Sequence, residues 1–199
     1  WAIYETLQKM REGDILLYLD SGISIYKLPP NFLDNMRDKD MMLVKVPREA
    51  GVTIKRELFE KVGLSEKDMF SEYWWAGCLL FKKTDKTLAF VKEWLTLTQD
   101  ESAISRDHDP TKQHPNYLIN LEDEATMVVT LLKNQKNACH KQLNVWIADF
   151  ITGHGHTLKK GSHGIVADMF SYHHRRNNKM SLFEMANTEC PIPIHPTHP

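Results

Sequence analysis

The sequence has few cysteines, no excess of charge of one sign and no long apolar run. Its 199 residues include three cysteines, Cys78, Cys139 and Cys190, an odd number spread far apart. This spacing argues against a disulfide framework and a paired-cysteine metal site, and it favours a reducing, cytoplasmic compartment. Cys78 lies in an apolar run, where core packing is the usual role of a cysteine.

The charges are balanced. Lysine and arginine number 25, aspartate and glutamate 26, and the two signs are interspersed. The basic field that drives binding to phosphate backbones is therefore missing, which argues against nucleic acid as a partner. No apolar stretch approaches the roughly 20 residues needed to cross a bilayer, so we expect no transmembrane segment. The length and the 42% hydrophobic content suit one domain with a core of its own.

One stretch near the start, residues 13–22, organises the rest of the chain. Its apolar run, Ile15 to Leu19, predicts a short strand buried on both faces. Asp20 follows, on a Ser-Gly turn. In open α/β sheets ligands bind beyond the carboxyl ends of the strands, so Asp20 could face a metal ion or a phosphate. The alternative is that Asp20 only makes an Asx turn that ends the strand.

The remaining pattern alternates between helices and strands and predicts an α/β fold. Apolar spacing and capping residues predict helices over residues 1–10, 32–36, 53–62, 85–97 and 122–134, and the start of another at 65. Strands are predicted over 15–19, 41–46, 73–81 and 143–147, with Pro47 ending the second. We expect one domain over residues 1–178, followed by an extended or disordered, proline-rich tail over 179–199.

Small residues interrupt the aromatic strand predicted over 73–81. Ala76 and Gly77 follow Trp75 in its middle. A glycine inside a strand often marks the close approach of a ligand or another backbone, because no Cβ shields the main chain. A β-bulge or tight packing under a helix explains Gly77 equally well.

Two polar regions carry further candidates. Glu122, Asp123 and Glu124 open the last predicted helix, where they either complement the helix dipole or point into a cleft. The polar stretch over residues 99–116 predicts a long loop, and such loops are usually functional or mobile. Within it, His108 stands between two aspartates, as a metal ligand or, more simply, as part of a solvated loop.

A second chemical cluster follows an aromatic pair late in the chain. His173, His174, Arg175 and Arg176 place two imidazoles and two guanidiniums together in the sequence. Imidazole is a common metal ligand, and the planar fork of arginine matches phosphate oxygens. The cluster therefore suits a metal-bound diphosphate, and a solvated basic edge is the alternative.

Taken in order, these segments resemble the GT-A type glycosyltransferases over about residues 1–178. The resemblance is greatest to the small enzymes of bacterial capsule or viral glycan synthesis and more distant to the family-8 glycosyltransferases. The matching segments are Gly13-Asp14-Ile15-Leu16-Leu17-Tyr18-Leu19-Asp20-Ser21-Gly22, Trp75-Ala76-Gly77-Cys78-Leu79-Leu80-Phe81, Val91-Lys92-Glu93-Trp94-Leu95 and Tyr172-His173-His174-Arg175-Arg176-Asn177.

This resemblance implies a GT-A-like, Rossmann-like mixed sheet flanked by helices, without the first nucleotide-binding strand. It implies a hexosyltransferase-type enzyme of polysaccharide biosynthesis with Mn²⁺ or Mg²⁺, a UDP-sugar donor and a glycan acceptor. Asp20 would bind the metal as the first acid of the DxD element, which here reads Asp-Ser-Gly. The other implied roles are metal contact by His173 or His174, substrate binding by Trp75, Ala76, Gly77 and Arg175, and catalysis by Asp123 or Glu124.

Two other functions remain open at this point. A metal-dependent phosphoesterase could use Asp20, His108 and His173, but the paired motifs of two-metal hydrolases are missing. A degenerate transferase-like domain could bind a glycan or another partner without turnover, as the single acid of the DxD element would allow.

Overall fold

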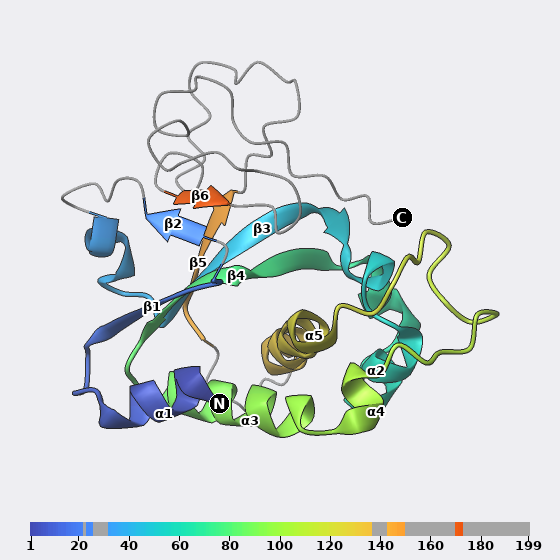
Figure 1. Cartoon of the computed structure of the whole chain (residues 1–199), viewed down its shortest axis with the longest axis horizontal. Coiled ribbons are helices and arrows are strands. Elements are labelled where there is room, and N and C mark those ends of the chain that lie inside the picture. Colours follow the sequence, from blue (N-terminus) through green and yellow to red (C-terminus); the bar gives the residue numbers. More distant parts are fainter. Residues whose placement is uncertain (22, 26–31, 137–142, 150–169, 173–199) are drawn as a thin grey trace, which may run out of the picture.

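A four-stranded sheet with helices packed on one face forms the body of the protein (Figure 1). The computed structural model describes residues 1–21, 23–25, 32–136, 143–149 and 170–172. Strands β1, β4 and β3 run antiparallel to their neighbours, and β5 runs parallel to β3. The strand order is β1 (Ile15–Leu19), β4 (Glu72–Lys82), β3 (Met41–Glu49) and β5 (Val145–Asp149), and a separate two-stranded sheet pairs β2 (Ile23–Ile25) with β6 (Phe170–Tyr172).

The helices are short except for two. The α-helices are α1 (Ala2–Lys9), α2 (Arg56–Lys61), α3 (Asp85–Thr98), α4 (Glu101–Ile104) and α5 (Glu122–Lys136), and the 3-10 helices are η1 (Phe32–Met36), η2 (Ala50–Val52) and η3 (Glu66–Phe70). The mixed α/β prediction is therefore confirmed at this level. Among the described residues, no helix has the length and apolar content needed to cross a membrane.

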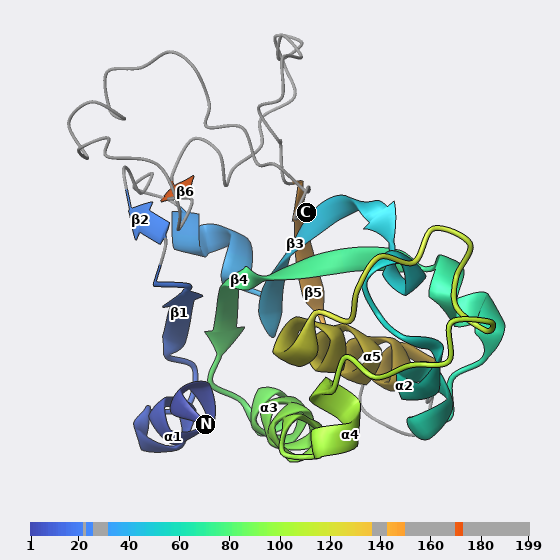
Figure 2. The ribbon, with the colours of Figure 1, turned by 45° about the vertical axis from the view of Figure 1, so that its right-hand side comes forward.

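Helix α5 is the central element of the core. It lies between the sheet and α3, and every residue from Ala125 to Leu132 is buried (Figure 2). Two of these residues are threonines, and each donates its hydroxyl to a carbonyl one turn back: Thr126 to Asp123 at 2.8 Å and Thr130 to Thr126 at 2.7 Å. Because both hydroxyls are hydrogen-bonded within the helix, the two threonines can be buried without an unpaired polar group.

The first predicted strand is present and packs on both faces, although less deeply than predicted: Leu16 and Tyr18 contact the larger buried cluster, and Leu17 and Leu19 the smaller one. Among the described residues, β1 pairs with β4 and with no other strand, so it lies at an edge of the sheet, with Leu17 opposite Leu80. All five of its residues are only half-buried. An apolar run indicates a strand, but it does not tell whether that strand has one neighbour or two.

The prediction that Pro47 ends the second strand is also wrong. Strand β3 continues to Glu49, and its pairing with β4 shifts register between Val46 and Glu49. Proline has no amide hydrogen, so an irregular stretch of the ladder is where a strand accepts it.

The other predicted helices and strands agree within a few residues, whereas the loop predicted over 99–116 contains the short helix α4. A capping box at Thr84 begins α3, as the Thr84 hydroxyl accepts a hydrogen bond from the Thr87 amide. Helix α2 begins after the predicted cap at Thr53, because the Thr53 amide closes the turn of η2 by donating to Ala50. Cys78 is buried in the core, and burial raises the pKa of its thiol to about 12. The predicted tail over 179–199 lies outside the described residues.

Candidate functional site

Asp20 stands where β1 ends and is held by two neighbours. Its amide donates a hydrogen bond of 2.9 Å to the carbonyl of Gly77, so the end of β1 is fixed to β4. Its Oδ1 accepts a hydrogen bond of 2.9 Å from the Tyr18 hydroxyl. Residues 18 and 20 of an extended chain point to the same side, which brings the phenol to the carboxylate. The same alternation in the sequence could have identified Tyr18.

Asp123 comes to the same place from the start of α5. Its carbonyl accepts hydrogen bonds from the Trp94 indole at 3.0 Å and from the Thr126 hydroxyl at 2.8 Å. Its side chain stays open to solvent on one side. Partial removal of the carboxyl from water raises its pKa, and the negative charge of Asp20 raises this pKa further. Asp20 and Asp123 therefore lie close enough to interact electrostatically, and we call these two residues the acidic pair.

Tyr18 links the two members of the acidic pair. Burial, the hydrogen bond to Asp20 and the charges of Asp20 and Asp123 together raise the pKa of Tyr18 to about 12. A tyrosine with this pKa keeps its proton at neutral pH. It therefore acts as the hydrogen-bond donor to Asp20, while the charge of Asp123 acts on it electrostatically.

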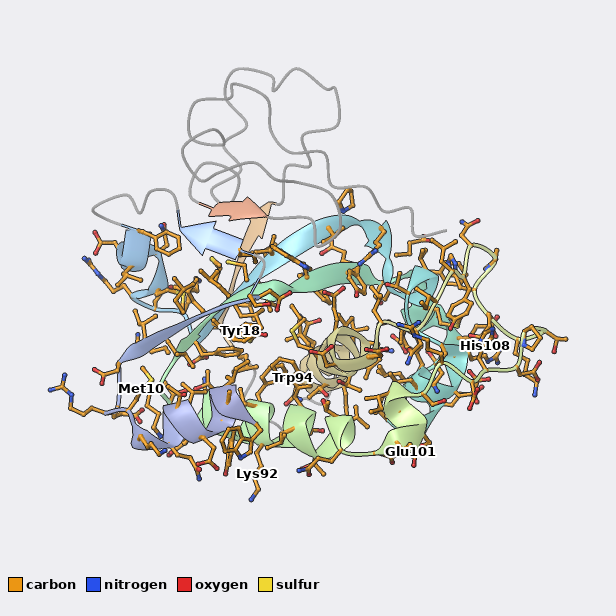
Figure 3. The ribbon with its side chains drawn as sticks, viewed as in Figure 1. Met10, Tyr18, Lys92, Trp94, Glu101 and His108 are labelled. Atoms are coloured by element: carbon orange, nitrogen blue, oxygen red, sulfur yellow. The ribbon has the colours of Figure 1, made fainter. Side chains whose placement is uncertain are left out.

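A cavity of about 170 Å³ opens beside the acidic pair. Figure 3 shows the side chains of Tyr18 and Trp94 close together, between β1 and α3. Most of the lining residues that the structure describes are aromatic or aliphatic, and Asp123 contributes an acidic side chain. Six of the lining residues are Trp1, Ile3, Tyr18, Trp94, Leu95 and Asp123.

Glu124, the second predicted catalytic acid, is engaged in the interior instead. Its Oε1 accepts a hydrogen bond from the Tyr73 hydroxyl and pairs with Arg48 at 3.2 Å, and its Oε2 accepts one from the Ala76 amide at 3.1 Å. The guanidinium of Arg48 also lies 4.1 Å from the centre of the Tyr73 ring. Burial raises the pKa of Glu124, against the hydrogen bond from Tyr73. Glu124 therefore anchors α5 to β4.

The Ala76-Gly77 segment forms a β-bulge. Between the pairs Met42–Leu80 and Val44–Trp75, β4 advances five residues (80 − 75) while β3 advances two (44 − 42). A Cβ at Gly77 would lie 2.3 Å from an atom of the Trp75 ring, so this indole covers the glycine. Of the two explanations for Gly77, the structure favours the bulge with close packing. It also adds a role, because the bulge presents the Gly77 carbonyl to Asp20.

The residue before Asp123 has an unusual backbone. Glu122 has φ of 38°, in the left-handed region that residues other than glycine rarely adopt. Its exposed carboxylate pairs with Arg106 at 3.0 Å. Strained backbone of this kind is often found at functional sites, where surrounding contacts hold it in place. Here those contacts are the hydrogen bonds to Asp123 and Glu124 on its carboxyl-terminal side.

The polar stretch over 99–116 is tied to the body by side chains that the sequence did not single out. The buried Lys55 donates its ammonium protons to the carbonyls of Ser105 at 2.6 Å and Asp107 at 3.1 Å. Glu57 accepts hydrogen bonds from the Asp109 amide at 2.7 Å and from the Gln113 side chain. Nothing in the local pattern marks Lys55 or Glu57, because their partners lie about 50 residues further along the chain.

Of the two sets of predicted ligands, the structure describes only His108, and His108 does not join the acidic pair. His108 is exposed, and Figure 3 shows it at the end of the molecule opposite Tyr18. The phosphoesterase arrangement of Asp20 with His108 is therefore not formed. His173, His174 and Arg175 lie outside the described residues.

The acidic pair suits a hard divalent cation. Within the described part of the chain, no group of three or more His, Cys, Asp and Glu side chains could hold a metal ion. Mg²⁺, however, is usually bound through one or two carboxylates, with water and substrate phosphates completing its shell. The carboxylates of Asp20 and Asp123 fit this donor set.

The comparisons with known proteins give no relative. No family model, curated protein or solved structure matches this chain. The function of the protein is therefore inferred from its site residues.

Proposed function

We propose that this protein transfers a sugar from a UDP-sugar or a related nucleotide-diphosphate donor to a hydroxyl of a glycan acceptor, on a GT-A-like domain. The observation that carries the proposal is the convergence of Asp20 and Asp123 on Tyr18, beside a cavity. Asp20 comes from the segment that resembles a DxD element, and Asp123 from the acidic helix start. These segments are about 100 residues apart in the sequence.

The chemistry requires a negative charge to be stabilised on the leaving diphosphate. A bound Mn²⁺ or Mg²⁺ would supply that stabilisation, with Asp20 as its protein ligand. Tyr18 fixes the orientation of the Asp20 carboxylate by donating to Oδ1. The raised pKa of Asp123 suits a group that accepts a proton from the acceptor hydroxyl, because a stronger base takes it more readily. Glu124 serves as a positioning residue, since its oxygens are bonded to Tyr73, Ala76 and Arg48.

Thermal unfolding with ligands tests this function. The chain is melted with a panel of nucleotide sugars, each with Mn²⁺ and with a chelator. A ligand at about 100 times its dissociation constant stabilises the folded state by about 2.7 kcal/mol, which raises the melting temperature measurably. We expect a shift with one donor in the presence of metal and none with the chelator.

Two variants make the test specific. Asp20→Asn should abolish the metal-dependent shift. Asp34→Asn, which changes an exposed aspartate on η1, is the matched control and should retain it. A shift that survives in Asp20→Asn, or no shift with any donor, would contradict the proposed function.

A further inference from the structure

The cavity beside Asp123 is too small for a nucleotide sugar. Its volume is about 170 Å³, whereas sites for drug-sized ligands usually enclose about 300–1,000 Å³. A single ring is the size of ligand that it can enclose. This limit separates the cavity from the place of a whole donor.

Three aromatic residues line the cavity. Trp1 comes from the start of α1, Tyr18 from β1 and Trp94 from α3. Leu95 and Val91 add aliphatic surface from α3. Flat aromatic surfaces of this kind gain free energy by covering the apolar C–H face of a ring, while polar groups at the ring edge stay hydrated.

The polar groups of the cavity favour a ligand that donates hydrogen bonds, because their own protons are already bonded. The Tyr18 hydroxyl proton is bonded to Asp20, the Trp94 N–H to the Asp123 carbonyl, and the Thr98 hydroxyl proton to the Trp94 carbonyl. The carboxylate of Asp123 accepts hydrogen bonds, and among the described lining residues there is no lysine, arginine or histidine side chain. The charged side chain of this lining is negative and repels a phosphate, so the lining favours a neutral ring that carries hydroxyl groups.

We propose that this cavity is the acceptor subsite and binds one neutral pyranose ring, with a hydroxyl directed at Asp123. This assignment rests on the proposed transferase function. In the transfer step, the acceptor oxygen forms a bond to the anomeric carbon of the donor. The bond from that carbon to the diphosphate oxygen breaks, and its electron pair leaves with the diphosphate. The hydroxyl proton passes to the carboxylate of Asp123.

Saturation-transfer NMR with monosaccharides tests the subsite in the absence of any donor. The probes are glucose, galactose, mannose and N-acetylglucosamine, each added to the full chain, with choline as a cationic comparison. Leu95→Phe places a larger side chain into the cavity. Leu88→Phe is the matched control, because Leu88 is a half-buried residue two turns earlier on α3 and does not line the cavity.

We expect saturation of the ring protons of at least one sugar with the wild type and with Leu88→Phe, and at least a tenfold weaker effect with Leu95→Phe. Failure of every sugar to bind, equal binding by Leu95→Phe, or preferential binding of choline would overturn the subsite. A parallel titration with UDP and Mn²⁺ keeps the two proposals apart. If the wild type does not bind UDP with Mn²⁺, the transferase function is contradicted. If it binds a sugar and Leu95→Phe does not, the subsite is supported.

Discussion

The Tyr18 hydroxyl donates a hydrogen bond of 2.9 Å to Asp20 Oδ1. This contact joins the end of β1 to the wall of the cavity, which Tyr18 shares with Asp123. Two carboxylates and one protonated phenol thus form a group at the junction of β1 and α5. Substitutions of Tyr18, Asp20 and their neighbours should therefore change the properties of this group in distinct ways.

Tyr18→Phe should weaken metal binding and leave the fold intact. The change removes the donor that orients Asp20 and keeps the ring that packs in the cavity wall. Loss of a group that orients a metal ligand typically lowers metal affinity about 10–100-fold, and we expect a loss in this range for Mn²⁺ measured calorimetrically with UDP. Tyr4→Phe is the control, because the hydroxyl of the half-buried Tyr4 accepts a hydrogen bond from the Gln8 side chain at 3.2 Å, away from the acidic pair. Equal affinities for the two variants would rule out the role given to Tyr18.

Asp20→Asn should lower the pKa of Asp123. The Asp20 charge is one of the causes that raise this pKa, and asparagine removes the charge at nearly the same volume. Carboxyl ¹³C NMR titrations of the wild type and the variant measure the difference. An unchanged Asp123 titration would mean that the acidic pair is not coupled.

The same coupling predicts a pH dependence of stability. Because the folded state raises the pKa of Asp123, it binds that proton more tightly than the unfolded state does. The stabilisation is therefore complete below the ordinary value of 3.8 and is lost as pH rises through the folded-state pKa. Urea unfolding across this range should show a smaller loss in Asp20→Asn than in the wild type.

Glu124→Ala should destabilise the fold by about 3 kcal/mol. The change leaves the Ala76 amide, the Tyr73 hydroxyl and the Arg48 guanidinium without their acceptor, and each unsatisfied group costs about 1–3 kcal/mol when buried. Urea unfolding measures the loss. Glu122→Ala removes only an exposed ion pair and should change the free energy of unfolding by less than about 1 kcal/mol. If the two variants were equally stable, Glu124 would not be the anchor of α5.

Gly77→Ala should also destabilise the fold, by about 1–3 kcal/mol, because the new methyl group would lie 2.3 Å from the Trp75 ring. Removing the ring should relieve this conflict. In the double variant Trp75→Ala/Gly77→Ala, the total loss measured by urea unfolding should be smaller than the sum of the two single losses. Strict additivity would show that the ring and the glycine do not contact each other.

The sequence predicted where helices and strands lie better than it predicted which elements and side chains contact one another. Apolar spacing located α3 and α5, and the acids at 122–124 correctly opened a helix, because these signals are local. The division of labour between Asp123 and Glu124 was not predictable, since it depends on Arg48 and Tyr73 from other strands. The edge position of β1 was missed for the same reason. It is set by which strand pairs with β4, and no residue within β1 encodes it.

The central claim is that Asp20 and Asp123 form one site, and Mn²⁺ binding tests it most directly. The free metal is measured by electron paramagnetic resonance during titration of the chain in the presence of UDP. Four proteins are compared: the wild type, Asp20→Asn, Asp123→Asn and the exposed control Asp34→Asn. The account predicts one bound ion per chain for the wild type and Asp34→Asn, at least a tenfold loss of affinity in Asp20→Asn, which removes the metal ligand, and a smaller loss in Asp123→Asn, which removes only a nearby negative charge. Wild-type affinity in both Asp20→Asn and Asp123→Asn would contradict it.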